Sequence, residues 1–363
     1  MGLGKTGYYT VKDIKKKKAQ YNIIIGERAP GKSYAVKAEA LRNAWKAKAP
    51  TMVIIRRFEE DIKTAYMQQY FGDNNENTGA DGDPFEITGG EFDSIYVMNS
   101  KIYFANRDPD SGKYSPGLLI GYCMALSNDE RYKSQQFPEV TDVIFEEFVT
   151  RKLYLRDEPV RLMNLISTIA RKREITVWMI ANTISRVCPY FLEWSLRNIP
   201  LMQQGTIDTY TFGDTKIAVE MAPTLQKKSR MFFGQAAKSI QGGQWEAEEL
   251  PALPEDYSEY DKLYEMYVEG QGFTFKLELL INSDAEKVIY VYPFTKQVKP
   301  ALPCITEEFT TDPQKRPYLN KEIPAEQMIS RLYMQGKICF SSNLCGADFG
   351  AVLKNMKGGL TSR

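Results

Sequence analysis

The first half of the chain contains four short apolar runs, at residues 21–25, 52–55, 143–145 and 176–181. Apart from their end residues, these runs do not alternate polar with apolar side chains. Continuous apolar runs of this length are typical of strands that a parallel sheet buries on both faces. We therefore expect the four runs to form the centre of one parallel sheet.

Helical patterns separate these strand candidates. Residues 33–47 form a helix candidate directly after the first strand. Before the fourth strand, Leu162, Leu165, Ile166 and Ile169 form an i, i+3, i+4, i+7 stripe, which is the spacing of one helix face. Strands that alternate with helices predict an α/β fold in which helices cover both faces of the sheet.

An insertion and a linker interrupt this alternation. Residues 95–98 and 101–104 read as the two strands of a hairpin between the second and third sheet strands. Prolines and a cluster of acids at residues 246–256 indicate a linker. We therefore expect three parts: an ATPase domain with a basic N-terminal arm at 1–205, a linker or lid region at 206–256, and a C-terminal domain at 257–363.

The C-terminal part reads as a small α+β domain. The apolar spacing over residues 260–267 predicts a short helix, and residues 273–281 and 287–292 predict strands. Two further helical patterns follow at residues 325–335 and 346–356.

The loop after the first strand carries the clearest chemical signal. Residues 26–33 read GERAPGKS, which fits the pattern GxxxxGK[ST] between an apolar strand and a helix. The glycines let backbone N–H groups turn toward phosphate oxygens, Lys32 reaches the β- and γ-phosphates, and the Ser33 hydroxyl binds Mg²⁺. The expected ATP-binding residues are Gly26, Glu27, Arg28, Ala29, Pro30, Gly31, Lys32, Ser33 and Tyr34.

Two acids follow the third strand. Glu146 and Glu147 come directly after residues 143–145, and an apolar strand that ends in two acids is the Walker B pattern. We expect Glu146 to hold Mg²⁺, although aspartate is usual at this position and glutamate is one methylene longer. Glu147 is the expected catalytic base, which would polarise the attacking water.

Composition narrows the remaining chemistry. The sequence has no histidine, which excludes Ser-His-Asp and Cys-His catalysis and argues against a zinc site. Its 47 Lys and Arg balance 46 Asp and Glu, so nucleic-acid binding would rely on local patches. The five scattered cysteines are expected to be reduced thiols. No apolar run is long enough to span a membrane, and without a secretory signal we expect a cytosolic protein.

Three segments together resemble the DNA-packaging ATPases of phi-29-type phages, which are small tailed phages with protein-primed linear genomes. They are NIIIGERAPGKSYAVK at residues 22–37, PEVTDVIFEEF at 138–148 and ARKREITVWMIANTISRVCPYF at 170–191. The similarity extends to MISRLYMQGKICFSSNLCGADFGAVL at 328–353. The resemblance implies an ASCE-type P-loop fold and a homo-oligomeric ring, a pentamer, at the portal protein of a procapsid. There it would pump double-stranded viral DNA inward, in the host cell cytoplasm.

The resemblance also implies roles for single residues. Arg171 matches the arginine finger that acts on the nucleotide of the neighbouring subunit, with Arg173 as an alternative, and an exposed cation after a helix fits that role. Asn182 matches the sensor position beside the γ-phosphate. Arg56 and Arg57 match paired arginines, one of which would hold Glu147 inactive, and Arg57 is our catalytic candidate. Lys133 matches a basic loop residue that would face DNA or the adjacent nucleotide.

The C-terminal domain of this family resembles an RNase H-like nuclease. In such a fold, acids hold two metal ions that cut DNA. Within the first expected strand, at residues 273–279, Glu278 is the only acid; Asp284 lies beyond it and Asp348 in a later helix. We therefore expect a vestigial domain without nuclease activity, which would grip DNA or dock on the portal, with a structural RNA as a possible mediator.

A basic cluster lies between the two expected domains. Lys227, Lys228 and Arg230 precede an apolar triplet, and they would either contact DNA phosphates or form a solvated turn. Two other functions stay open from the residues: a helicase or conjugation-type ATPase that prefers single strands, and a non-enzymatic nucleotide switch. The second acid, Glu147, argues against the switch, because a pure binder does not need it.

Overall fold

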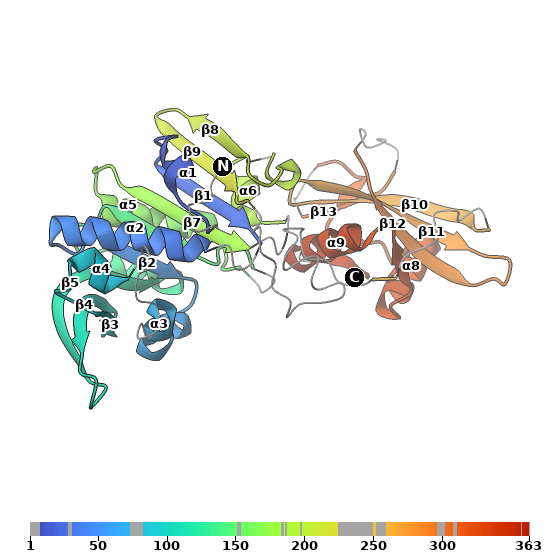
Figure 1. Cartoon of the computed structure of the whole chain (residues 1–363). Helices are drawn as coiled ribbons and strands as arrows, with labels where there is room; N and C mark the ends of the chain where they lie inside the picture. Colours follow the sequence, from blue (N-terminus) through green and yellow to red (C-terminus); the bar gives the residue numbers. More distant parts are fainter. Residues whose placement is uncertain are drawn as a thin grey trace. The chain divides into compact units, whose positions relative to one another are not determined.

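A computed structural model of the chain describes most of the 363 residues. The described residues are 8–27, 31–72, 83–150, 154–182, 185, 187–196, 198–223, 250–251, 259–295, 302–307, 311–356 and 358–362. The chain divides into two units (Figure 1). The first comprises Met1–Thr183 and Asn198–Gln244, and the second comprises Ile184–Arg197 and Trp245–Arg363.

A nine-stranded mixed sheet organises the first unit, in the order β3-β4-β5-β2-β6-β7-β1-β9-β8. The six strands from β5 to β9 in this order pair in parallel, and the strands at both edges pair antiparallel. The strands are β1 (Tyr21–Gly26), β2 (Met52–Arg56), β3 (Ser94–Met98), β4 (Lys101–Arg107), β5 (Tyr114–Ala125), β6 (Asp142–Glu146), β7 (Thr176–Asn182), β8 (Ile207–Phe212) and β9 (Thr215–Met221).

The four apolar runs do form the middle of this sheet. Strands β2, β6, β7 and β1 are neighbours in that order, and nearly all of their residues are buried. The prediction from the continuous apolar runs is therefore confirmed, because these strands are buried on both faces of the sheet. The predicted insertion is also confirmed, since β3 and β4 pair antiparallel around Asn99 and Ser100.

Helices and 3-10 turns connect these strands. They are α1 (Lys12–Lys15), α2 (Lys32–Ala47), η1 (Glu59–Ile62), α3 (Thr64–Phe71), α4 (Pro84–Thr88), η2 (Leu126–Tyr132), α5 (Glu158–Ala170) and η3 (Ile199–Leu201). The longest, α2, packs against β2, β6 and β7 (Figure 1). The stripe predicted on α5 is its buried face: Leu162 and Ile169 are fully covered, and Leu165 and Ile166 nearly so.

The first unit extends further along the chain than the sequence indicated. We expected a linker or lid region from residue 206, but Ile207–Phe212 and Thr215–Met221 are strands of the large sheet. Strand β9 pairs in parallel with β1 and buries five consecutive residues from Ile217. This burial explains why the segment joins the sheet. The rest of the expected linker lies mostly outside the described residues.

A six-stranded sheet organises the second unit, in the order β14-β13-β10-β11-β12-β16. Its strands are β10 (Asp261–Gly270), β11 (Phe273–Ile281), β12 (Lys287–Pro293), β13 (Cys304–Thr306), β14 (Lys315–Arg316) and β16 (Ile338–Phe340). A separate pair is formed by β15 (Tyr318–Leu319) and β17 (Gly359–Ser362). The helices are α6 (Pro189–Glu193), α8 (Pro324–Met334) and α9 (Asn343–Asn355).

One predicted helix of the second unit is wrong. Residues 260–267 have helical apolar spacing, yet Asp261–Gly270 is strand β10, which pairs antiparallel with β11. Gln271 and Gly272 join the two strands with φ angles of 51° and 77°. Two consecutive positive φ angles are typical of the tight turn of a β-hairpin. The glycines at 270 and 272 were the signal that the helical spacing concealed.

Within the described ranges, no helix is long and apolar enough to cross a membrane.

Candidate active site

The loop between β1 and α2 lies where the sequence motif predicts. Strand β1 ends at Gly26, and α2 begins at Lys32 after Gly31, whose φ of 90° requires a residue without a β-carbon. A side chain at Gly26 would also collide with Ala222 just after β9, because its β-carbon would lie 2.9 Å from that of Ala222. The first glycine thus serves strand packing as well as the loop. Arg28, Ala29 and Pro30 lie outside the described residues.

Lys32 connects this loop to the end of β7. Its side chain is buried, and its ammonium group donates hydrogen bonds to the backbone carbonyls of Gly26, at 3.2 Å, and Glu27. It also donates to Oδ1 of Asn182 at 3.1 Å. Asn182 is opposite Gly26 in the pairing of β7 with β1. The structure therefore brings together two residues that the sequence separates by 150 positions.

Glu146 lies at the carboxyl end of β6 and faces α2. The Ser33 hydroxyl donates to its Oε2 at 3.0 Å, so the two expected metal-binding residues are in contact. The Glu146 carboxyl is buried, and this burial raises its pKa above the ordinary value. A cation brought to this position would favour the ionised carboxylate.

Tyr70 and Lys37 also belong to this site, and the sequence analysis did not find them. The Tyr70 hydroxyl, from α3, donates to Oε1 of Glu146 at 2.6 Å. Lys37, one turn after Ser33 on α2, places its ammonium group 4.1 Å from the centre of the Tyr70 ring. Burial lowers the pKa of Lys37 to about 8. Neither residue belongs to a motif, so only the packing of α3 against the site could reveal them.

Glu147 follows directly but points elsewhere. Its φ of 55° turns the chain out of β6, and its side chain is 65 % exposed. The Arg56 guanidinium, at the end of β2, donates to Oε2 of Glu147 at 2.9 Å. The two neighbouring acids are thus in different surroundings, one buried against hydroxyl groups and one exposed beside an arginine.

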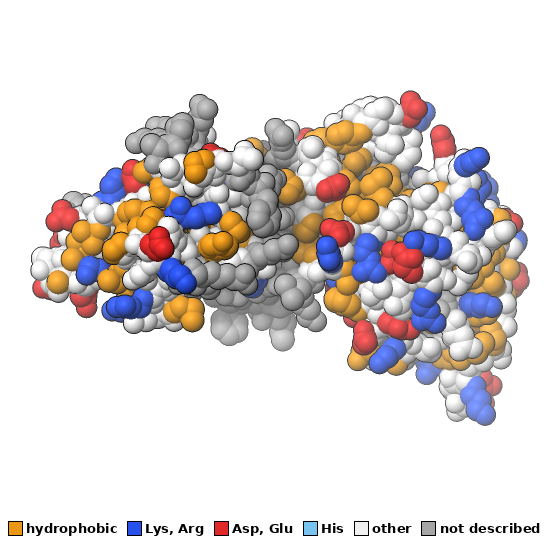
Figure 2. All heavy atoms as spheres, turned by 180° about the vertical axis from the view of Figure 1, so that it is seen from behind, with side chains coloured by type: hydrophobic (Ala, Val, Ile, Leu, Met, Phe, Trp, Pro, Cys, Tyr) orange, Lys and Arg blue, Asp and Glu red, His pale blue; other side chains and the backbone are white. Residues whose placement is uncertain are grey.

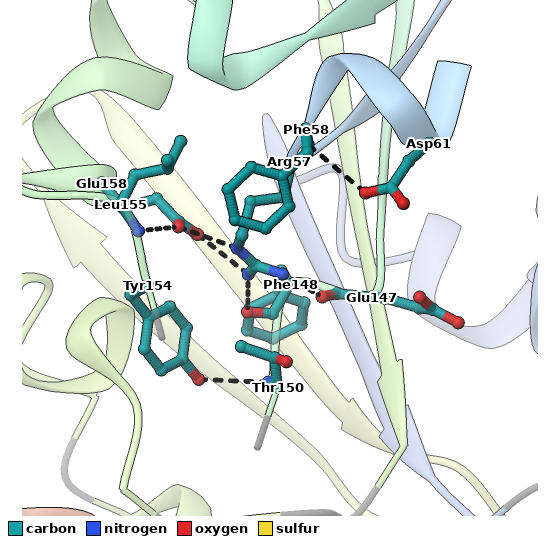
Figure 3. Close-up of polar contacts among 9 residues, drawn as sticks. All are labelled: Arg57, Phe58, Asp61, Glu147, Phe148, Thr150, Tyr154, Leu155 and Glu158. Carbon is teal, nitrogen blue, oxygen red and sulfur yellow. Dashed lines mark hydrogen bonds and ion pairs between the residues drawn. The ribbon is translucent and has the colours of Figure 1, made fainter. Parts of the chain in front are cut away.

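Arg57 has a different role from its neighbour. Its guanidinium donates to both carboxylate oxygens of Glu158, at 2.8 and 2.9 Å, and to the backbone carbonyls of Glu147 and Phe148, at 3.1 and 2.8 Å. Figure 3 shows the Glu147 side chain pointing away from this guanidinium. Of the two arginines, Arg56 therefore reaches the Glu147 carboxylate. Arg57, our sequence candidate, holds the backbone carbonyls of Glu147 and Phe148.

The two candidate finger arginines also differ. Arg171 ends α5 with an αL conformation, is exposed, and donates to the Gln135 carbonyl at 3.0 Å. Arg173 donates to three backbone carbonyls, those of Val140, Phe137 and Ile169, at 2.7 to 2.8 Å. Three such bonds fix Arg173 within its own subunit, so the geometry favours Arg171 for any contact outside it.

The expected DNA contacts fall on exposed or undescribed parts of the chain. Lys133 follows η2 and pairs with Glu130 at 2.6 Å, with half of its side chain exposed. Lys227, Lys228 and Arg230 lie outside the described residues. Figure 2 shows basic and acidic side chains interspersed on the visible face of each unit. This mixture agrees with the balanced net charge.

The three acids that the sequence singled out in the second unit lie in different surroundings. Glu278, on β11, accepts from Lys276 and from the Tyr292 hydroxyl, each at 3.0 Å. Asp284 is exposed in the turn after β11, and Asp348 is buried in α9. No group of three or more acids or cysteines positioned to hold a metal ion occurs in the part of the chain that the structure describes.

The fold and the site define a class of protein. A parallel sheet, a glycine loop that leads into a helix with Lys32 and Ser33, and an acidic strand end beside them are typical of P-loop nucleotide-binding proteins. The family described as Podovirus DNA encapsidation protein (Gp16) matches residues 3–247. The chain belongs to this family.

Individual relatives agree with this assignment. The DNA packaging protein of Bacillus phage phi29 is 29 % identical over 180 residues, which are 48 % of this chain and 46 % of that protein. The corresponding protein of Bacillus phage B103 is 27 % identical over 179 residues, 48 % of each chain. The matched region thus spans about half the length of these relatives.

A solved structure supports the fold over a longer range. The bacteriophage Phi-29 viral genome packaging motor assembly matches with a TM-score of 0.55 and 19 % identity. The match covers 93 % of this chain and 95 % of that one. The similarity in fold therefore includes both units.

Proposed function

We propose that this protein is the ATP-driven motor that moves double-stranded viral DNA into a procapsid through the portal protein. One observation carries the proposal. In a member of a DNA encapsidation family, the end of β1, the start of α2 and the end of β6 bring Lys32, Ser33, Glu146 and Glu147 to one edge of the sheet. Strand β7 lies between β1 and β6, which supports the ASCE-type arrangement.

Mg²⁺ and ATP are the ligands that the site fits. The Ser33 hydroxyl and the Glu146 carboxylate, 3.0 Å apart, are the hard oxygen donors that Mg²⁺ prefers. Mg²⁺ bound with the nucleotide would neutralise charge on the phosphates. We propose that the loop and the first turn of α2 hold the nucleotide, through Gly26, Glu27, Gly31, Lys32 and Tyr34.

Three further side chains of the site would act on the nucleotide and on the attacking water. Lys32 would exchange its carbonyl partners for phosphate oxygens when the nucleotide binds. Asn182, which accepts from Lys32 at 3.1 Å, would then lie beside the γ-phosphate. Glu147 would orient and deprotonate the attacking water, and its bond to Arg56 holds it back until that bond opens.

Two proposals concern the assembly. We infer that Arg171 acts on the nucleotide of an adjacent copy, because its side chain is exposed at the end of α5. We further propose that the copies form a ring of five at the portal, in the host cytoplasm. The second unit contains a meander, β12-β11-β10, extended by β13 and β14, which supports a vestigial RNase H-like domain that grips DNA or docks on the portal. A structural RNA could mediate that docking.

DNA contact would be mainly to phosphates. Lys133 is half exposed, and with Lys227, Lys228 and Arg230 it would provide positive charge without reading bases. Binding of this kind weakens steeply as salt rises and shows little sequence preference.

Steady-state ATP hydrolysis with duplex DNA, single-stranded DNA or no DNA tests the proposal. The motor is expected to hydrolyse ATP several-fold faster with duplex than with either alternative, and the stimulation should disappear between about 50 and 200 mM salt. Preferential stimulation by single strands would instead favour a helicase. Hydrolysis that ignores DNA would overturn both translocase functions.

A further inference from the structure

The Glu146 carboxylate is held at both oxygens by two different helices. Ser33, on α2, donates to Oε2 at 3.0 Å, and Tyr70, on α3, donates to Oε1 at 2.6 Å. One carboxylate oxygen, Oε2, is therefore directed toward the nucleotide loop, and the other, Oε1, toward α3. The P-loop motif explains only the contact at Oε2.

Tyr70 is itself fixed from two directions. Lys37 donates to the backbone carbonyl of Tyr70 and lies over its ring, at 4.1 Å from the ring centre. The Phe71 ring packs edge-on against Tyr70, with ring centres 5.3 Å apart. These contacts leave the phenol group little freedom, so its hydroxyl is preorganised toward Glu146.

The rest of α3 is anchored to the sheet. Gln68 donates to the Ile95 carbonyl at 2.8 Å and accepts from the Val97 backbone N–H at 3.0 Å, so its amide bridges two positions of β3. A side-chain amide in this position substitutes for a neighbouring strand. The helix that carries Tyr70 is therefore attached to the same nine-stranded sheet that carries Glu146.

We propose that Tyr70 is a positioning residue of the metal site, which adapts it to glutamate in place of the usual aspartate. Glutamate has one more rotatable bond than aspartate, and an unrestrained carboxylate would turn away from the metal for part of the time. By binding Oε1, Tyr70 keeps Oε2 directed at Ser33. This inference rests on the proposed Mg²⁺ and ATP site.

Equilibrium binding of a fluorescent, non-hydrolysable ATP analogue, titrated with Mg²⁺ and without it, tests the inference. Tyr70→Phe removes the hydroxyl and keeps the ring beneath Lys37. It is expected to raise the half-saturating Mg²⁺ concentration by about tenfold, which is about 1.4 kcal/mol, and to leave affinity without Mg²⁺ unchanged. Tyr66→Phe is the matched control, since Tyr66 is an exposed tyrosine on the same helix.

A double-mutant cycle makes the role of the glutamate explicit. An aspartate carboxylate at position 146 is too short to reach Tyr70, so Tyr70→Phe should have no additional effect on the Mg²⁺ titration in the Glu146→Asp background. Equal effects of Tyr70→Phe in both backgrounds would show that the hydroxyl does not act through Glu146, and would overturn the inference.

The wild-type titration separates this inference from the proposed function. If wild type binds the analogue with Mg²⁺ and Tyr70→Phe behaves like Tyr66→Phe, the positioning role is wrong and the ATPase assignment stands. If wild type shows no Mg²⁺-dependent binding, the proposed site itself is wrong. Thermal unfolding of each variant shows whether a changed titration comes from a changed fold.

Discussion

The Arg57 guanidinium binds Glu158 through two hydrogen bonds, at 2.8 and 2.9 Å, and both side chains are almost completely buried. The same group binds the carbonyls of Glu147 and Phe148 (Figure 3). Glu147 has a positive φ, a conformation that is strained for a residue with a β-carbon. The ion pair therefore anchors the strained turn that carries the proposed catalytic base.

Breaking this ion pair should destabilise the first unit strongly. Glu158→Ala leaves a buried arginine without its anion, which typically costs about 3–5 kcal/mol. Urea unfolding followed by tryptophan fluorescence measures the loss. The matched control is Glu59→Ala, which removes the exposed partner of Arg131 and should cost less than about 1 kcal/mol. Similar losses in the two variants would contradict the structural role of Arg57.

Releasing Glu147 from Arg56 should change how DNA controls turnover. Arg56→Ala removes the 2.9 Å contact with the Glu147 carboxylate and leaves Arg57 in place. ATP hydrolysis without DNA is expected to rise several-fold, and the ratio of rates with and without duplex should fall. Arg56→Lys keeps a cation near Glu147 and should lie between wild type and Arg56→Ala. A fall in the DNA-free rate would contradict an inhibitory contact.

Arg171 and Arg173 should differ in their effect on stability. Arg173→Ala removes a guanidinium donor from three backbone carbonyls and should cost about 1–3 kcal/mol in the free energy of unfolding. Arg171→Ala removes an exposed side chain and should change stability by less than about 0.5 kcal/mol. Urea unfolding of the two variants compares them directly, and the reverse order would show that Arg171 is the structural residue.

The stability of the first unit should depend on pH through Glu220. Burial raises the pKa of this carboxyl, which accepts from Tyr9 at 2.6 Å, from 4.5 to about 7. The folded state therefore binds the proton more tightly than the unfolded state. The stabilisation from the protonated Glu220 carboxyl is complete below about pH 4.5. It is lost as pH rises through about 7, and the loss is about 3 kcal/mol.

Glu220→Gln isolates this contribution. The variant should lose the part of the stability decrease between pH 5 and 7 that belongs to Glu220, as measured by urea midpoints across that range. Tyr9→Phe is the complementary control: the Tyr9 hydrogen bond lowers the pKa of Glu220, so its removal should extend the decrease to higher pH. Identical pH profiles for wild type and Glu220→Gln would contradict this account.

The sequence predicted the central sheet and the elements around the phosphate-loop motif because both depend on local patterns. The runs that became β1, β2, β6 and β7 are continuous and apolar, and the motif at residues 26–33 fixes its own strand, loop and helix. Order and spacing along the chain were sufficient for these features.

Features that depend on distant packing could not be read in advance. Strand β9 joins the sheet only because β1 offers an edge, and β10 becomes a strand because β11 pairs with it. Tyr70 reaches Glu146 from 76 residues away, and nothing around Tyr70 in the sequence indicates a site. The sequence could not show which of Arg56 and Arg57 reaches the Glu147 carboxylate. Adjacent residues of an extended segment point to opposite sides, and the sequence does not say which side faces Glu147.

An active site shared between subunits can be detected by mixing two inactive variants. Duplex-stimulated ATP hydrolysis would be measured for Arg171→Ala, for Glu147→Gln, and for mixtures of the two over all ratios. Each variant alone should be nearly inactive. Mixtures should regain turnover, with a maximum near equal amounts, because one copy supplies Arg171 and its neighbour supplies Glu147. If mixing only averages two inactive proteins while wild type remains active, each site is complete within one chain, and the shared-site account is contradicted.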